Sequence, residues 1–207
     1  ELTSKGARLL IISHLGRPKG KIMEEFSLTK IVDAFAEEVD AEEITMIPDC
    51  IGRVVKKVGA DLKPGGIAIL ENLRFHSGEE KNNKEFAKKL SENADIFVND
   101  AFSVSHRKHA STNAIADLLP SYAGRSLETE IDMLEKITNK IDRPLMAIIG
   151  GSKISTKINL LENLVNKVDF LVIGGAMANT FLGAKGFSLG KSYLEKDHFK
   201  TALNVLD

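Results

Sequence analysis

The stretch ARLLIISHLGRPKGK, residues 7–21, joins an apolar run to a loop that is rich in cationic side chains. Residues 7–13 are typical of a buried strand. Four cationic or titratable side chains follow it, separated by glycine and proline: His14, Arg17, Lys19 and Lys21. Hydrogen-bond donors with so little bulk between them, at the mouth of a buried strand, favour the binding of a highly charged anion.

The same alternation of apolar runs and helical patterns continues along the chain. Further strand-like runs occupy residues 44–47, 66–70, 95–98, 145–149 and 170–173. Apolar residues recur at spacings of three and four, as in helices, in residues 27–39, 51–62, 84–94 and 157–168. Near-continuous apolar strands separated by helices indicate parallel strands that are buried on both faces. The predicted fold class is therefore α/β, with two doubly wound, Rossmann-like parallel-sheet domains.

One helical stretch, residues 121–140, differs from the others. It lies between Pro120 and Pro144, and its apolar residues form a single stripe: Leu127, Ile131, Leu134 and Ile137. We interpret it as an interdomain helix, although an ordinary surface helix of a single sheet fits the pattern about as well.

This interpretation divides the chain into an N-terminal domain (1–120), a helix and hinge (121–142) and the start of a second domain (143–207). Two strands are too few for an independently stable sheet. Either the second domain continues beyond residue 207, which would leave it incomplete here, or the boundary is misplaced.

Composition excludes several classes of function. With 43% hydrophobic and 28% charged residues, the 207-residue chain resembles ordinary globular proteins, and its formal net charge of −1 lacks the basic field of a nucleic-acid binder. Two Tyr and no Trp offer little for base stacking. We therefore expect no nucleic-acid partner.

The cellular compartment is predicted from sequence features that are absent. Cys50 is the only cysteine, so we expect a small buried residue rather than a reactive thiol or a disulfide. No apolar run approaches the roughly 20 residues that span a bilayer, and no signal peptide follows residue 1. We expect a cytoplasmic protein without a membrane partner.

Cationic residues follow several of the predicted strands. Ligands of open α/β sheets bind beyond the carboxyl ends of the strands. Three arginines and two histidines come directly after the strands near residues 7–13, 66–70 and 95–98: Arg17, Arg74, Arg107, His14 and His106. A single arginine here would be read as a solvated charge, but three favour an anion with several oxygens.

We expect these residues to converge on one edge of a sheet. Asn72, Asn99 and Asp100 could orient the arginines or contact ligand hydroxyls. We expect no protein-bound metal at this edge, because no carboxylate or Cys lies at metal-ligand spacing beside His14 and His106.

Two glycine-rich turns follow the later strands, in MAIIGGSKISTK (146–157) and FLVIGGAMANTF (170–181). Glycine lets backbone N–H groups approach a phosphate, and a helix N-terminus adds a favourable dipole. Lys153 and Lys157, four residues apart, should share one face of the first helical turns. The spacing is not that of a Walker A motif, and tight packing turns also use such glycine pairs. Two anion sites on two domains would suit phosphoryl transfer.

Five motifs, in this order, resemble the phosphoglycerate kinase family: SHLGRPKGK (13–21), ENLRFHSGEEKNN (71–83), FVNDAFSVSHRKHAST (97–112), GGSKISTKINLLENL (150–164) and VIGGAMANTFL (172–182). The resemblance runs from about residue 5 to the end of the chain. It implies reversible phosphoryl transfer between 1,3-bisphosphoglycerate and ADP, giving 3-phosphoglycerate and ATP, with Mg²⁺ bound through the nucleotide. It also implies a monomer.

The resemblance assigns roles residue by residue. It implies that the following residues bind the phosphoglycerate: His14, Leu15, Gly16, Arg17, Arg74, His106 and Arg107. It implies nucleotide contacts for Gly151, Ser152, Lys157, Gly174 and Gly175. Lys157, with Lys153, would contact the phosphoryl group in flight and act in catalysis.

The chain also departs from the family pattern. Ala176 stands where a third glycine is common, and Ser152 where many members have Ala; both are small, so we expect tolerance. The family's first strand and its later nucleotide segments are missing, so we expect this chain alone to be inactive. The alternative function is a non-catalytic binding module for a phosphorylated metabolite.

Overall fold

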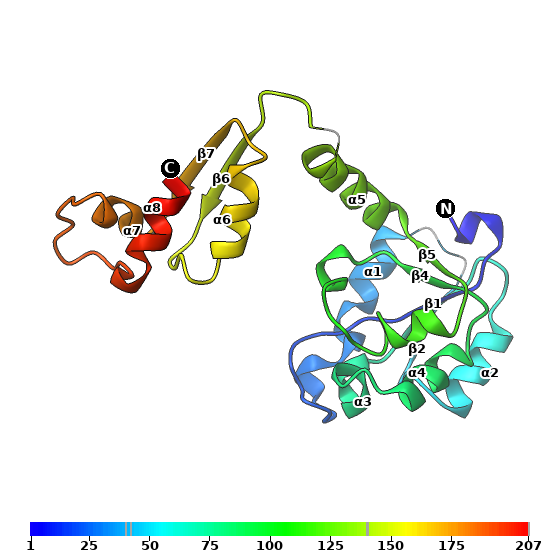
Figure 1. Ribbon diagram of the computed structural model, residues 1–207. Coiled ribbons are helices and arrows are strands. Elements are labelled where there is room, and N and C mark those ends of the chain that lie inside the picture. Colours follow the sequence, from blue (N-terminus) through cyan, green and yellow to red (C-terminus); the bar gives the residue numbers. More distant parts are fainter. Residues whose placement is uncertain (40, 42, 140, 207) are drawn as a thin grey trace. The chain divides into compact units, whose positions relative to one another are not determined.

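The structure is a computed structural model that describes residues 1–39, 41, 43–139 and 141–206. The chain divides into two compact units, Glu1–Glu130 and Ile131–Asp207. Helix α5 (Arg125–Thr138) begins in the first unit and ends in the second. Figure 1 labels the elements of both units.

The first unit contains two parallel sheets. Its elements, in chain order, are η1 (Thr3–Lys5), β1 (Leu9–Ile11), η2 (Glu24–Phe26), η3 (Leu28–Ile31), α1 (Val32–Glu38), β2 (Ile44–Ile47), α2 (Arg53–Asp61), β3 (Ile67–Leu70), η4 (Leu73–Phe75), α3 (Ser77–Glu80), α4 (Lys84–Ser91), β4 (Phe97–Asn99), η5 (Phe102–Val104), η6 (Ala114–Asp117) and β5 (Ser121–Ala123). One sheet has the order β1-β3-β2, and the other pairs β4 with β5.

Strand β3 forms the centre of the first unit. All four of its residues are at most 1% exposed, so both faces of the strand are covered. Ala68 and Leu70 belong to a core that also contains Val55 of α2 and Phe86 of α4. The burial of both faces confirms the prediction of a doubly covered parallel strand here. The segment Glu71–His76 follows the carboxyl end of β3, and the candidate site is built on this segment.

Two predictions for the first unit were wrong. Strand β4 was expected in the same sheet as β1 and β3, but its ladder partner is β5. Residues 121–123 were expected to begin a helix, but they form β5, and α5 begins at Arg125. Asp100 explains where the helix begins, because its Oδ1 accepts hydrogen bonds from Ser126 N (2.7 Å) and Leu127 N (3.0 Å).

The second unit contains one pair of parallel strands. Its elements are β6 (Met146–Gly150), α6 (Ile158–Val165), β7 (Phe170–Gly174), α7 (Met177–Ala184), η7 (Lys196–His198) and α8 (Phe199–Leu206). The strands pair in register from Met146 with Phe170 to Gly150 with Gly174. Leu161 of α6, Met177 of α7 and Ala202 of α8 are fully buried in its core.

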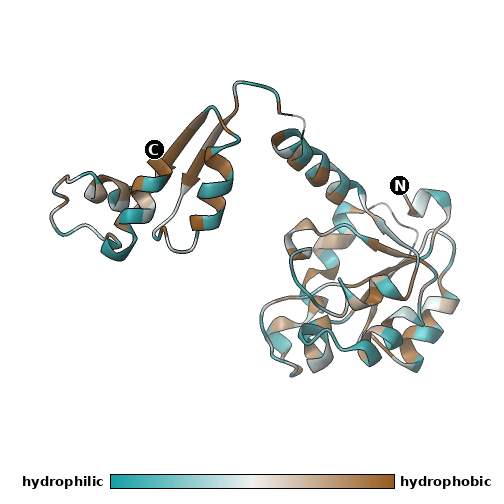
Figure 2. Ribbon diagram, in the orientation of Figure 1, coloured by the Kyte–Doolittle hydropathy of each residue, from teal (hydrophilic) through white to brown (hydrophobic). Residues whose placement is uncertain are grey.

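The two strands of this unit are covered on one face only. Ile149 and Leu171 pack against the core, whereas Ile148 and Phe170 are 71% and 56% exposed. Both strands are strongly hydrophobic (Figure 2). The prediction of strands buried on both faces was therefore wrong for β6 and β7 in this chain. Along α5, Leu127 is buried, while the other residues of its predicted stripe are exposed: Ile131, Leu134 and Ile137.

No helix within the described ranges has both the length and the apolar character that a membrane crossing requires.

The Asp100 contacts predict a loss of stability when they are removed. Asp100→Ala should lower the free energy of unfolding by about 1 kcal/mol, because two N–H groups in the first turn of α5 lose their acceptor. Asp100→Asn keeps a side-chain oxygen and should lose less. Urea unfolding followed by circular dichroism measures both. An alanine variant as stable as the parent would contradict the capping role.

Candidate functional site

The buried side chain of Asn72 joins three backbone segments at the end of β3. Its Nδ2 donates to the carbonyl oxygens of Leu15 (2.7 Å) and Phe26 (2.9 Å). Its Oδ1 accepts from Arg74 N (3.0 Å) and so begins the short helix η4. The residue has no exposed surface. Asn72 therefore orients the loops around the site through their backbone atoms, whereas the sequence suggested that it orients arginine side chains or contacts ligand hydroxyls.

The neighbouring Glu71 supports the same arrangement. Its carboxylate accepts from Ser27 Oγ (2.6 Å) and from Leu28 N (2.8 Å). Leu73 N in turn donates to Ser13 O (3.1 Å). These contacts bind the loop that follows β1 to the loop that follows β3.

Arg74 is the central cation of this region, and its residue is only 4% exposed. Its Nη1 donates to Gly16 O (2.8 Å), and its Nε lies 3.5 Å from Glu80 Oε1. That ion-pair distance does not provide a well-formed hydrogen bond, and among the described residues neither Nε nor Nη2 of Arg74 has a hydrogen-bond partner.

Arg107 repeats this feature, because its buried Nε also lacks a hydrogen-bond partner within the described chain. Buried donors are rarely left unpaired, since their desolvation is costly. Two guanidinium groups with buried free donors therefore point to an anionic ligand.

The charges of both arginines act on His14. Burial lowers the pKa of its imidazole, and the positive charges of Arg74, Arg107 and His109 lower it further. Glu80 opposes this effect. The structure thus brings His14, Arg74 and Arg107 together, as the sequence predicted, and adds His109. We call these four residues the cationic cluster.

The loop 13–21 is shaped to fit Arg74. Gly16 has φ +63°, and a Cβ there would overlap the Phe26 ring. Gly20 N donates to Arg74 O (3.0 Å). Backbone carbonyls of Leu15 and Gly16 accept the Asn72 and Arg74 donors, so these two residues contribute main-chain atoms that hold the cluster in place.

A buried carboxylate, Glu79, holds the segment that carries Arg107. It is 3% exposed and accepts from Ser111 N (3.1 Å) and Ser111 Oγ (2.6 Å). Its Oε1 lies 3.6 Å from His109 Nδ1. Neither Glu79 nor His109 was predicted from the sequence to belong to a site. The only signal was the run HRKH, in which His109 shares a short segment with Arg107.

The other cationic residues of the prediction are not drawn into this cluster. Arg17 and His106 are exposed, and neither side chain forms a hydrogen bond or an ion pair with the residues that the structure describes. Asp100 and Asn99 do not orient the arginines. Asp100 caps α5, and Asn99 Oδ1 accepts from Ala101 N (3.0 Å).

The two glycine-rich turns of the second unit lie side by side, as predicted. Gly150 and Gly174 are register partners, and Met177 N donates to Gly151 O (2.8 Å). Gly175 has φ +68°, and a Cβ there would lie 2.7 Å from Gly151 O. This close approach of two backbones explains why glycine is required.

The lysines do not share a helical face, so that prediction was wrong. Helix α6 begins at Ile158, and residues 153–157 form a turn in which Lys157 N donates to Ile154 O (2.8 Å). Ile154 is fully buried, and Ser155 Oγ donates to Glu195 Oε1 (2.7 Å), which holds the turn. The half-buried Lys157 lies over Gly151, while Lys153 is exposed.

A family model described as phosphoglycerate kinase matches residues 1–207. The chain belongs to the phosphoglycerate kinase family. It is 51% identical to the phosphoglycerate kinase of Bartonella henselae and 49% identical to that of Rhizorhabdus wittichii, each over 207 residues. These alignments cover 100% of this chain and 52% of each relative, so the chain spans about half the length of the curated relatives it matches.

Solved phosphoglycerate kinase structures resemble this one. The Coxiella burnetii structure aligns with a TM-score of 0.86 and 40% identity, over 99% of this chain and 51% of that one. The Pyrococcus horikoshii structure aligns with a TM-score of 0.82 and 32% identity, over 99% and 54%. The phosphoglycerate kinase fold confirms the predicted α/β class.

The cationic cluster predicts how His14 titrates. In the ligand-free chain its pKa should lie below the ordinary histidine value, so folded His14 is neutral in the interval between the two pKa values, where the unfolded chain is protonated. Folding stability from this group is present above that interval and is lost as the pH falls through it. NMR titration of the imidazole resonances measures the pKa.

Sulfate, used as a probe anion, should raise the pKa of His14 because it offsets the arginine charges. The imidazole resonances of His198, in the second unit, serve as the control and should not move when sulfate is added. A His14 pKa that is unchanged at saturating sulfate would contradict the proximity of the anion to the cluster.

Proposed function

We propose that the protein to which this chain belongs catalyses reversible phosphoryl transfer between 1,3-bisphosphoglycerate and ADP, producing 3-phosphoglycerate and ATP. The observation that carries the proposal is the set of buried guanidinium N–H groups without partners among the described residues, Nε and Nη2 of Arg74 and Nε of Arg107, whose charges act on His14. A phosphorylated carboxylic acid supplies the oxygens that such donors require. Among phosphorylated carboxylic acids, membership of the family favours the phosphoglycerate as the ligand.

In this proposal residues 1–120 form the acid-binding domain. Arg74 and Arg107 bind the acid, and the loop with His14, Leu15, Gly16 and Arg17 closes one wall of its site. His106 contributes from the loop that carries Arg107. Helix α5 (Arg125–Thr138) would serve as the interdomain helix, and the residues that follow it, up to 142, as the hinge.

Residues 143–207 begin the nucleotide-binding domain. Gly151, Ser152, Gly174 and Gly175 would lie against the nucleotide, and Lys157 would reach its phosphates. The turns present backbone N–H groups and an ammonium, which suit phosphate oxygens rather than a cation. Mg²⁺ would therefore be held by the nucleotide phosphates, whose charge it neutralises.

The chemistry requires no covalent enzyme intermediate. A carboxylate oxygen of 3-phosphoglycerate attacks the γ-phosphorus of ATP, the bond to the β-phosphate oxygen breaks, and ADP leaves. Lys157 and Lys153 would stabilise the charge on the transferred group, and the arginines would hold the acceptor in position. We further propose a monomer that acts in the cytoplasm, in keeping with the single cysteine and the family.

A calorimetric titration of the chain with 3-phosphoglycerate tests the acid site. Arg74→Met retains the aliphatic stem and loses the charge, so the affinity should fall at least roughly tenfold. Arg53→Met, an exposed arginine on α2, is the matched control and should bind like the parent. Equal affinity of the Arg74 variant and the parent would contradict the assignment.

Transfer is tested separately, on the whole protein that contains this chain. ATP and 3-phosphoglycerate should yield ADP in a coupled assay, and Lys157→Met should lower kcat more than it raises the KM for the acid. Binding of the acid without any transfer would instead support the alternative, a non-catalytic binding module.

A further inference from the structure

Three potential metal ligands come together at the end of the Glu71–His76 segment, which supplies one of them, His76. Asp49, Cys50 and His76 each offer a ligand atom, and these atoms all lie within 4.8 Å of one another. Asp49 Oδ1 and His76 Nε2 are 2.8 Å apart. The set provides one oxygen, one sulfur and one nitrogen atom, which is the chemistry that Zn²⁺ accepts and Mg²⁺ does not.

Surrounding contacts already orient all three side chains. Asp49 Oδ1 accepts from Cys50 N (2.6 Å), and Cys50 Sγ contacts Glu71 O at 3.3 Å. The His76 ring stacks on Phe86, with centroids 5.0 Å apart and an interplanar angle of 27°. Ligands whose positions are fixed by neighbouring groups lose little freedom when a metal binds.

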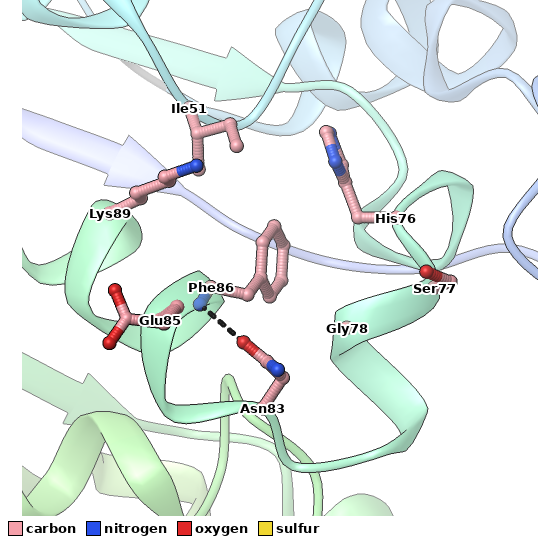
Figure 3. A pocket seen from close by; sticks show the side chains of 8 residues that line it. All are labelled: Ile51, His76, Ser77, Gly78, Asn83, Glu85, Phe86 and Lys89. Carbon is pink, nitrogen blue, oxygen red and sulfur yellow. Dashed lines mark hydrogen bonds between the residues drawn. The ribbon is translucent and has the colours of Figure 1, made fainter.

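The cluster can be reached from solvent. Asp49 and His76 have side chains that are 47% and 30% exposed, whereas Cys50 is buried beneath them. His76 also lines a pocket of about 270 Å³, together with Ile51 and Phe86. Figure 3 shows His76 and Phe86 on the walls of this pocket. A cation can therefore approach from the exposed side and keep a water molecule as its fourth ligand.

The local charge also favours a cation. The Asp49 carboxylate lies beside the Cys50 sulfur, and its negative charge would stabilise a divalent cation bound there.

We propose that Asp49, Cys50 and His76 form a binding site for a thiophilic divalent cation such as Zn²⁺, separate from the Mg²⁺ that accompanies the nucleotide. Binding forms the metal–sulfur bond and releases the thiol proton to solvent. From the sequence, we considered a metal only at the edge with His14 and His106 and expected Cys50 to be an inert residue. The predicted burial of Cys50 is confirmed, but the 25 residues between Cys50 and His76 concealed their proximity.

Cd²⁺ titration of the chain, followed by the ultraviolet thiolate-to-metal charge-transfer band, tests the site. We expect one equivalent to bind, Zn²⁺ to compete with it, and Mg²⁺ to have no effect. Because Cys50 alone would also give a band, the decisive variants are His76→Gln and Asp49→Asn. Each should weaken binding by at least about 10-fold, the lower end of the loss caused even by outer-shell changes.

Asp49→Asn retains an oxygen that can accept from Cys50 N, so the turn should persist. His198→Gln is the matched control and should bind Cd²⁺ like the parent. Cd²⁺ affinities that are equal in the parent, His76→Gln and Asp49→Asn would overturn the three-ligand site.

One measurement does not depend on any variant folding. In the parent chain, Zn²⁺ should shift the ¹⁵N resonances of the His76 imidazole and leave those of His198 in place. A His76 spectrum that is unchanged at saturating Zn²⁺ would also overturn the proposal.

Discussion

The buried amide of Asn72 is the contact on which the arrangement of the first unit depends. It joins the end of β3 to the backbone of Leu15 and Phe26, and it begins the helix η4 that carries Arg74. Asn72 itself is fully buried, so the loss of one of these hydrogen bonds would leave a polar atom of its amide unpaired in the interior. The position of Arg74 therefore follows from an uncharged side chain that would not itself touch a ligand.

Asn72 allows a positive cluster to persist without full internal compensation. The charges of Arg74, Arg107 and His109 act on His14, and the carboxylates of Glu80 and Glu79 form only long contacts with Arg74 (3.5 Å) and His109 (3.6 Å). Burying cations with free donors is unfavourable, and it is tolerated because the loops are held by Asn72, Glu71 and Glu79. An anion bound among these donors removes the cost, so the structure is prepared for such a ligand before it arrives.

Local patterns in the sequence predicted the elements better than their pairing. The β3 run and the glycine turns at 150–151 and 174–175 were predictable, because burial and close backbone approach dictate the residue types at those positions. Strand β5 was missed because three residues between Pro120 and Gly124 carry too little periodicity. The partner of β4 could not be inferred, since pairing depends on contacts between distant segments.

The candidate site likewise contains residues that could be predicted from the sequence and residues that could not. His14, Arg74 and Arg107 were predictable because each follows a strand, which limits where its side chain can lie. His109 and Glu79 were not, because their roles depend on a contact between α3 and a loop about 30 residues away along the chain, at Ser111. Lys153 and Lys157 were misplaced because the burial of Ile154 replaces the expected first helical turn with an irregular one.

The central claim is that the free guanidinium donors of Arg74 and Arg107 bind the acid. The most direct measurement is ¹⁵N NMR of their Nε–H groups while 3-phosphoglycerate is titrated into the chain. We predict that both resonances shift with the same saturation curve and that both protons exchange more slowly with water. Saturable binding that leaves both Nε–H groups unchanged would contradict the claim.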